Sequence, residues 1–304
     1  LAIPMATDIA FSLGVLSLLG KRVPLSLKIF LTAFAVVDDI GGILVIAVFY
    51  SSHVAYGYLL VAILLLILLY FVGKRAVTNK LFFLVIGVVI WYLFLQSGIH
   101  STIAGVLLAF VIPAKPQLRV GRYIERIRRI INTFPVMGEN DIVLTNEQIA
   151  QLKRVESASD RVISPLQSLE DNLHGVVNYI ILPLFAFVNA GVVFSGGGEV
   201  IGEVSIAVAL GLLCGKFLGI YFFTWLAVKS KLTPMPQGMD WKNIAGVALL
   251  GGIGFTVSLF IANLSFGVTH PVLLNQAKFG VLSGTALAGI LGYIVLYLVL
   301  PKKR

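Results

Sequence analysis

The sequence predicts an all-α polytopic membrane protein, and two features predict this class: its composition and the spacing of its apolar runs. Hydrophobic residues make up 58% of the 304 residues, charged residues only 12%, and the mean hydropathy is +0.97. A soluble domain carries about 25% charged residues. Apolar runs long enough to cross a bilayer as helices recur along the whole chain. Because these runs are continuously apolar rather than alternating, they favour helices over barrel strands.

Nine membrane-spanning helices are expected. The fourth and fifth nearly touch at "LQSGIHS", where a short turn is expected because one joined helix would be far too long for a bilayer. The spans cover approximately residues 1–20, 26–50, 57–73, 81–97, 98–114, 175–195, 204–228, 243–266 and 273–299.

The distribution of Lys and Arg supports nine spans and orients them. With this count, 21 of the 23 basic residues fall in loops on one side, whereas the opposite loops hold only Lys278. Basic loops face the cytoplasm, so these loops and the C-terminus are expected to be cytoplasmic. The remaining basic residue, Lys216, lies within the seventh span. The net charge of +9 therefore belongs to membrane loops and does not indicate nucleic-acid binding.

The spans divide the chain into three segments: residues 1–114 with five spans, a cytoplasmic segment at 115–174, and residues 175–304 with four spans. Within the cytoplasmic segment, "RVGRYIERIRRIINTF" at 119–134 is basic and amphipathic. It can lie on the anionic inner leaflet or pack on the protein's own cytoplasmic face. The rest of this segment is too short for a catalytic domain and carries no nucleotide or metal-binding motif.

Four ionisable residues lie within the spans: Asp8, Asp38, Asp39 and Lys216. Each costs at least about 2.5 kcal/mol at the centre of a bilayer. A purely structural salt-bridge cluster is disfavoured because three carboxylates face one ammonium. The imbalance leaves room for two positive charges, either protons or a metal cation.

The adjacency of Asp38 and Asp39 suggests a division of labour. Neighbours on a helix point about 100° apart, so one aspartate can meet Lys216 while the other faces a hydrated cavity. A hard cation such as Na⁺ or Li⁺ binds only deprotonated carboxylates. Protons and cation therefore compete for one site, which is sufficient chemistry for exchange.

Two spans look interrupted in mid-membrane. In "PMATD", Pro4 disrupts the preceding turn, Thr7 can cap a new helix start, and Asp8 faces the positive end of that helix dipole. In "LLGGIGFTVSLF", glycines are followed by hydroxyl side chains: Gly251, Gly252, Gly254, Thr256 and Ser258. Either break alone can be a packing kink, but a pair of interrupted spans points to a transporter site.

Five motifs carry a family resemblance, in this order: "IPMATDIAFSLGVLSLLG", "VVDDIGGILVIAVFY", "ILPLFAFVNAGV", "LLCGKFLGI" and "GGIGFTVSLFIANLSFG". Together they resemble the NhaA family of bacterial Na⁺/H⁺ antiporters. The resemblance runs from residue 1 to about residue 295 and corresponds to the fourth to twelfth of twelve family spans. It implies an inverted-repeat fold with two broken, crossing helices, in a multi-pass protein of the bacterial inner membrane.

The resemblance also implies roles for the intramembrane residues. Asp38 and Asp39 would exchange ions and protons, with Asp39 the more direct cation ligand, Lys216 the partner of Asp38, and Thr7 an added oxygen. Asp8 would balance helix dipoles, and Gly252, Gly254 and Thr256 would belong to the opposing break. The implied activity is electrogenic, pH-regulated export of Na⁺ or Li⁺ against protons, with no cofactor besides the transported ions.

Further expectations concern regulation and assembly. "LEDNLHG" occupies the cytoplasmic entrance that the family links to pH response, so Glu170, Asp171 and His174 are candidate pH sensors; a solvated loop end is the alternative. A homodimer is expected for the full-length protein. The chain starts in mid-pattern, so three preceding spans are expected in that protein, and the chain alone is expected to lack part of the repeat. The 136–164 stretch looks longer than the family's, with no assigned role.

Two rival functions use similar residues. An intramembrane aspartyl protease needs two aspartates sharing a proton, but on different helices facing each other, whereas Asp38 and Asp39 are adjacent on one. A Na⁺-coupled solute symporter could share the broken-helix architecture, but the spans offer few polar residues to hold a solute.

Overall fold

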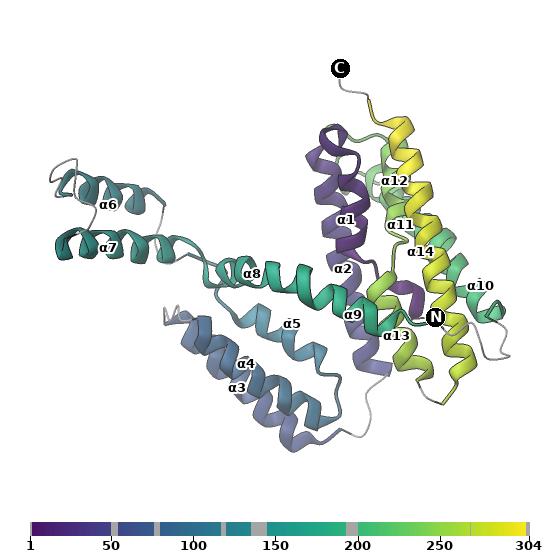
Figure 1. The fold of residues 1–304 in the computed structure, drawn as a ribbon, viewed down its shortest axis with the longest axis horizontal. Helices are drawn as coiled ribbons and strands as arrows, with labels where there is room; N and C mark the ends of the chain where they lie inside the picture. Colours follow the sequence, from purple (N-terminus) through teal and green to yellow (C-terminus); the bar gives the residue numbers. More distant parts are fainter. Residues whose placement is uncertain are drawn as a thin grey trace. The chain divides into compact units, whose positions relative to one another are not determined.

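The computed structural model describes residues 2–49, 54–75, 80–116, 120–134, 145–192, 200–267 and 269–301, and all regular elements among them are helical (Figure 1). The chain forms two compact units, one of residues 1–50 with 177–304 and one of residues 51–176. The cytoplasmic segment predicted at 115–174 therefore folds with the third to fifth spans. The first two spans fold with the C-terminal ones.

The first unit consists of eight α-helices and four short turns of 3₁₀ or π helix among the described residues. Its elements are η1 (Ile3–Met5), α1 (Ile9–Ser17), η2 (Gly20–Arg22), α2 (Leu25–Phe49), η3 (Val177–Ile181), α9 (Leu182–Asn189), α10 (Glu203–Leu210), η4 (Gly211–Gly215), α11 (Lys216–Lys229), α12 (Trp241–Leu250), α13 (Phe255–Phe266) and α14 (Pro271–Val299).

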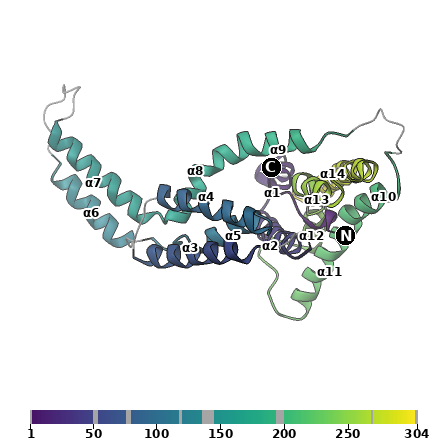
Figure 2. The same ribbon diagram turned by 90° about the horizontal axis from the view of Figure 1, so that it is seen from below.

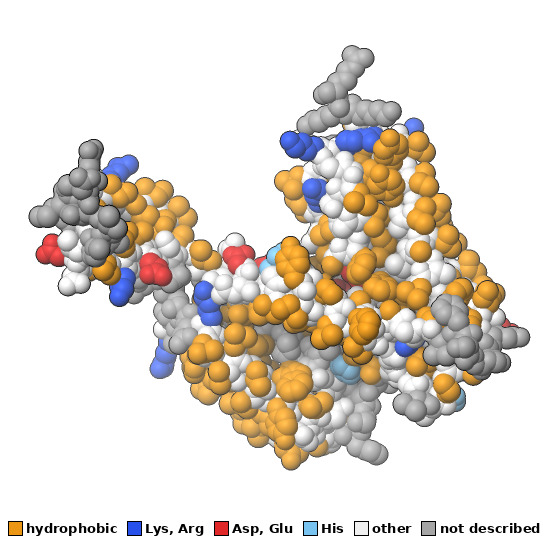
Figure 3. Space-filling view, viewed as in Figure 1, with side chains coloured by type: hydrophobic (Ala, Val, Ile, Leu, Met, Phe, Trp, Pro, Cys, Tyr) orange, Lys and Arg blue, Asp and Glu red, His pale blue; other side chains and the backbone are white. Residues whose placement is uncertain are grey.

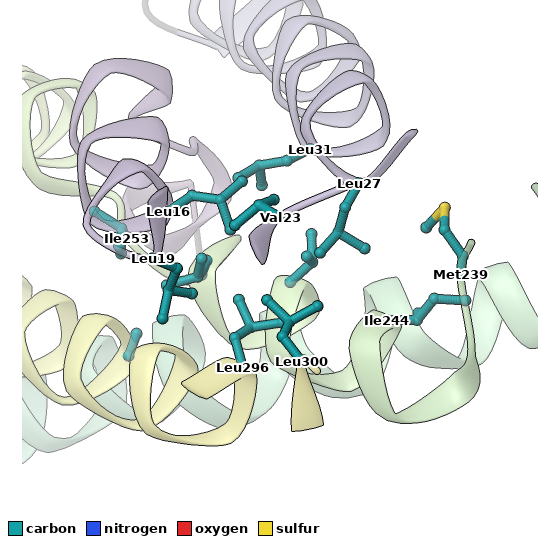
Figure 4. Packing of buried hydrophobic residues seen from close by; sticks show 13 residues of the cluster. Leu16, Leu19, Val23, Leu27, Leu31, Met239, Ile244, Ile253, Leu296 and Leu300 are labelled. Atoms are coloured by element: carbon teal, nitrogen blue, oxygen red, sulfur yellow. The ribbon is translucent and has the colours of Figure 1, made fainter. Parts of the chain in front are cut away.

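One hydrophobic core of this unit lies where α1, α2, α12 and α14 meet (Figure 4). Leu16, Leu31 and Leu296 are almost completely buried there. The long helix α14 packs closely on α10 and α12 because small residues face its neighbours: a Cβ at Gly284 would lie 3.0 Å from Cα of Ala209. Such close backbone approach is the usual means of helix association in a membrane.

The second unit is built from α3 (Tyr56–Lys74), α4 (Lys80–Ser97), α5 (Thr102–Val111), α6 (Val120–Asn132), α7 (Asn146–Val162) and α8 (Pro165–Val176). Helices α3, α4 and α5 pack together around Leu69, Phe83 and Ile90. Helices α6 and α7 lie side by side as a hairpin (Figure 2). Arg119 and residues 136–144 of the predicted cytoplasmic segment lie outside the described residues.

Six described helices are long and apolar enough to cross a membrane, or seven if the bent α12–α13 pair is one span. Many large apolar side chains lie on the surface (Figure 3), as expected of a lipid-facing protein. Two of the nine predicted spans are not single helices of this length. The first span is split into η1 and α1, and the fifth contains only the ten residues of α5, which ends just before Pro113.

Two predicted boundaries have different outcomes. The turn at "LQSGIHS" is confirmed, since α4 ends at Ser97 and Gly98 has a φ of 79°. The sixth span was predicted at about 175–195, and the helix that contains most of it runs from Pro165 to Asn189. It begins early because the Ser164 hydroxyl accepts a hydrogen bond from Gln167 N–H at 3.2 Å and Pro165 occupies the first helical position. Residues 193–195 lie outside the described residues.

Candidate functional site

The two predicted helix breaks are present, and they contact each other. Between η1 and α1 the chain is extended, and between α12 and α13 it bends by 44°. The Asp8 N–H donates to the Ile253 carbonyl at 2.6 Å, and the Ser12 hydroxyl donates to the Leu250 carbonyl at 3.0 Å. The Asp8 N–H of the first break and the Ile253 carbonyl of the second break thus satisfy each other.

Glycine is required at the second break because other backbone comes very close. A Cβ at Gly252 would overlap the Leu212 carbonyl oxygen of η4, and one at Gly254 would lie 2.9 Å from the Ala6 carbonyl oxygen. No side chain fits at either position without moving the main chain. The predicted glycine break is therefore a packing requirement as well as an interruption.

Asp8 connects the N-termini of two helices, and it is almost fully buried. Its Oδ1 accepts from Phe11 N–H at 3.1 Å and so caps α1. Its Oδ2 accepts from Thr256 N–H at 3.1 Å and from the Thr256 hydroxyl at 2.6 Å, in the first turn of α13. Asp8 therefore lies at the positive dipole ends of both helices. The predicted cap by Thr7 is wrong, because Asp8 itself is the N-cap.

Thr7 instead faces the charged pair. Lys216 forms an ion pair with Asp38 Oδ2, the pairing that the family resemblance implied. The Lys216 ammonium also donates to the Thr7 hydroxyl at 2.8 Å. That hydroxyl lies 2.8 Å from Asp38 Oδ2 and 2.7 Å from the Gly251 carbonyl oxygen, and its single proton can serve only one of them. Thr7 therefore links the ion pair to the second break.

Lys216 owes its position to an irregular turn. It is the first residue of α11 and directly follows the π-helical turn η4. A π turn inserts an extra residue into a helix and redirects the side chains after it, and such turns are frequent at functional sites. The same turn brings the Leu212 carbonyl against Gly252.

Asp39 differs from the other two carboxylates. Asp8 is balanced by two helix N-termini and Asp38 by Lys216, whereas Asp39 Oδ1 is buried with no hydrogen-bond partner among the described residues. A buried oxygen without a partner is costly. A bound proton or a bound cation would remove this energetic cost.

A cavity of about 390 Å³ lies at the ion pair, lined by Asp38 and Lys216 together with Pro4, Met5, Phe34 and Ile220 among others. The sequence led us to expect the cavity beside the aspartate that does not pair with Lys216. The cavity instead lies at the paired one, because Asp39 is not among its lining residues. No group of three or more His, Cys, Asp or Glu side chains within the described ranges could hold a metal ion. Any cation there would need hydroxyl, carbonyl or water oxygens as well.

The candidate pH sensors lie in the second unit. Glu170, Asp171 and His174 are exposed residues of helix α8. The description of this stretch as a loop end was wrong, because the helix already begins at Pro165.

Sequence reasoning missed several polar contacts of the first unit. Asn263 on α13 donates to Asn189 at the end of α9 at 2.7 Å, and Lys278 on α14 donates to the Gly191 carbonyl at 3.1 Å. Ser12, four residues after Asp8 on the same helix, contacts the second break. Polar residues within otherwise apolar spans were the available signal for Ser12 and the two asparagines. Nothing in the sequence indicated which carbonyls they would meet.

Comparisons with known proteins place this geometry in a family context. The family model described as Na⁺/H⁺ antiporter 1 matches residues 1–296. A Na(+)/H(+) antiporter NhaA of Bacteroides fragilis is 85% identical over the whole chain, which covers 70% of that relative. Proteins of the same name from Bacteroides thetaiotaomicron and Parabacteroides distasonis are 81% and 52% identical. The whole chain is matched in both, and it covers 69% of each relative.

Proposed function

We infer the function from the family: the chain belongs to the Na⁺/H⁺ antiporter 1 family, and it is a membrane antiporter that exchanges Na⁺ for H⁺. It is a secondary transporter and not an enzyme, and neither the solute symporter nor the intramembrane protease is favoured by this family. The finer proposal is electrogenic, pH-regulated export of cytoplasmic Na⁺ or Li⁺ in exchange for external protons. Its support is the family resemblance and the unequal environments of the aspartates.

Exchange is proposed to occur at Asp38 and Asp39 by competition between protons and the cation. The observation that carries this proposal is the buried Asp39 Oδ1, which has no hydrogen-bond partner among the described residues. A proton or a cation at Asp39 removes the cost of that oxygen, but both cannot occupy it together. Each cation that binds must therefore displace protons, which links the two fluxes.

Asp38, Lys216 and Thr7 are proposed to respond to the occupant of Asp39. Asp38 forms an ion pair with Lys216 and lines the cavity. When a cation approaches, Asp38 can turn from the lysine toward it, and the Thr7 hydroxyl can move its hydrogen bond to the Gly251 carbonyl. Asp38, Asp39 and Thr7 would then supply the protein oxygens around Na⁺ or Li⁺, with water completing the shell.

Asp8 is proposed to hold the site together electrostatically rather than to bind the ion. The N-terminus of a helix carries about half a positive charge, and Asp8 accepts hydrogen bonds from the first turns of both α1 and α13. Without this carboxylate, two partial positive charges would face the region that a cation must enter. Gly252, Gly254 and Thr256 allow the close approach that brings the second N-terminus to Asp8.

The remaining proposals concern regulation and surroundings. Glu170, Asp171 and His174 are proposed as pH sensors because they are exposed and titratable on α8, which leads directly into a membrane helix. The positive-inside rule supports an inner-membrane protein with cytoplasmic basic loops and a cytoplasmic C-terminus. Anionic lipid at the 119–134 helix and a homodimer of the full-length protein are also proposed, and the transported ions are the only small molecules required.

The test uses the full-length protein in vesicles with an imposed proton gradient and a pH-sensitive dye. Addition of Na⁺ or Li⁺ should dissipate the gradient, and a symporter would respond only when its solute is added. A protein that gives no Na⁺- or Li⁺-dependent signal at any pH from roughly 6.5 to 9 would contradict the finer proposal.

A further inference from the structure

Helices α6 and α7 form a hairpin with its own small core. Ile130 of α6 and Ala158 of α7 are buried, and the Tyr123 hydroxyl lies 2.8 Å from the Ser159 hydroxyl oxygen. The start of α6 therefore meets the end of α7, so the two helices are antiparallel. A capping box at Thr145 fixes the beginning of α7.

One side of this hairpin exposes apolar residues from both helices. On α6, Val120, Ile124 and Ile131 are more than half exposed, and at about 100° per residue they fall within about 40° of one another. On α7, Ile149 and Leu152 are exposed at neighbouring positions.

The two stripes lie on the same side of the hairpin. On each helix we compare the direction of the exposed stripe with the direction of the buried side. Going round the helix in the direction of increasing residue number, the stripe lies about 70° past the buried side on α6 and about 100° past it on α7. Because the helices are antiparallel, equal senses of rotation bring both stripes to one face. Figure 3 shows hydrophobic side chains on the surface of this hairpin, with Lys and Arg side chains at its edges.

The charge of the hairpin matches an anionic surface. Helix α6 carries four arginines and one glutamate, a net charge of +3. All four arginines are exposed: Arg122, Arg126, Arg128 and Arg129. At about 100° per residue, Arg128 lies about 60° from the centre of the apolar stripe and can reach past it to phosphate groups. The other three arginines lie on the far side of α6 and add to the positive charge of the hairpin.

The chain also keeps the hairpin near a bilayer. Only the eight residues 112–119 separate the end of the apolar helix α5 from the start of α6, and they span at most about 28 Å. After α7, only Ile163 and Ser164 precede the helix that continues into the sixth span. Both ends of the hairpin are thus tied to membrane segments.

We propose that the α6–α7 hairpin docks on the anionic surface of the bilayer through one apolar face, formed by Val120, Ile124, Ile131, Ile149 and Leu152. This extends the lipid contact proposed for the 119–134 helix to a two-helix surface with a defined orientation. It does not depend on the ion-exchange site. A hairpin packed on the protein's own cytoplasmic face, or on a second copy, is an alternative that the following experiment distinguishes.

Leu152 and Ala150 provide a matched pair of probe positions. Both are exposed on α7, but they point about 160° apart. In the full-length protein, all native cysteines, Cys214 included, are replaced by serine, and Leu152→Cys or Ala150→Cys is labelled with a polarity-sensitive fluorophore. The proteins are reconstituted in phosphatidylcholine vesicles with or without phosphatidylglycerol.

With phosphatidylglycerol, a label at 152 should be quenched by nitroxide lipids and protected from aqueous iodide, and a label at 150 should behave in the opposite way. High salt should release the label at 152, because screening weakens attraction to the surface. Each basic residue near an anionic bilayer strengthens binding about fivefold, so Arg128→Gln should weaken docking about fivefold. A triple variant that also replaces Arg126 and Arg129 by Gln should weaken it further, by at most roughly a hundredfold.

Three outcomes would overturn the proposal. Equal lipid quenching at 150 and 152 would show that the hairpin has no membrane-facing side. Protection of 152 from iodide without phosphatidylglycerol, and without lipid quenching, would show packing on the protein itself. Protection that rises with the protein-to-lipid ratio would show contact with a second copy. The salt titration uses the unchanged arginines and remains decisive if the triple variant does not fold.

Discussion

Replacing Asp8 by Asn tests whether one carboxylate joins the two broken helices. Asp8 accepts from Phe11 N–H and from both the N–H and the hydroxyl of Thr256. An Asn side chain offers one oxygen, and its amide nitrogen must face one of these donors whichever way it turns. The change keeps the size of the side chain while removing its charge and one of its two acceptor atoms.

The expected cost follows from these contacts. Losing the capping bond costs about 1 kcal/mol. Losing the charge at two helix N-termini costs about 0.3–1 kcal/mol each, and up to about 2 kcal/mol where the site is buried, as it is here. The total is roughly 2–4 kcal/mol, which should lower the midpoint of thermal unfolding in detergent by on the order of 5 °C.

Asp240→Asn is the matched control. Asp240 is also the N-cap of a helix, α12, but it is exposed and its side chain makes no capping hydrogen bond. The same change of charge should therefore shift the midpoint much less. If Asp8→Asn unfolds at the temperature of the parent, or of Asp240→Asn, then Asp8 does not hold the two breaks together.

Three further substitutions probe the rest of the site. Thr7→Val removes the hydroxyl that contacts Asp38 and Lys216. A hydrogen bond to a charged group is worth about 1.5–3 kcal/mol. Its loss should therefore raise the Na⁺ concentration for half-maximal dye response about tenfold or more. Gly252→Ala should lower the free energy of unfolding by about 1–3 kcal/mol through overlap with neighbouring backbone. Lys216→Met leaves Asp38 without its partner and should destabilise the protein by about 3–5 kcal/mol.

Each of these has its own control and contrary result. Thr7→Ser keeps the hydroxyl and should retain the parent's half-maximal Na⁺ concentration; equal behaviour of the Val and Ser variants would remove Thr7 from the site. Gly14→Ala, at a helical position with open space, should be neutral or stabilising by up to about 1 kcal/mol. A Gly252 variant as stable as the Gly14 variant would refute the close approach. Lys216→Met combined with Asp38→Asn should recover part of the lost stability, and no recovery would argue against the pair.

The sequence predicted the class of fold and which charged residues lie within the spans. Carboxylates and glycine clusters are rare within apolar spans because they are costly there, so they stand out in the sequence. It also predicted which aspartate meets Lys216, through the family resemblance. It did not predict that Asp8, rather than Thr7, caps α1. Asp and Thr are both good N-caps. In the folded protein the Thr7 hydroxyl contacts Lys216 and Asp38, and Asp8 caps α1.

Other features depended on tertiary packing and had no local signature. The cavity lies at Asp38 because η1 and η4 line it, and neither element is defined by a sequence period. Ser164 and Pro165 are typical of a helix start, so they indicated where the helix of the sixth span begins. The hydropathy pattern used to place the span locates apolar residues and misses the polar first turns of that helix. Short helices such as α5 were counted as spans because their flanking residues are also apolar.

The most direct test of the account compares Asp39→Asn with the full-length parent in proteoliposomes, with Na⁺-dependent dissipation of a proton gradient as the readout. Asn cannot carry the negative charge for which Na⁺ and protons compete, so the account predicts loss of the dye response at every pH and Na⁺ concentration, in a protein that still inserts and unfolds like the parent. Transport by Asp39→Asn at the parent's rate and with the parent's pH dependence would contradict the assignment of ion and proton exchange to this carboxylate.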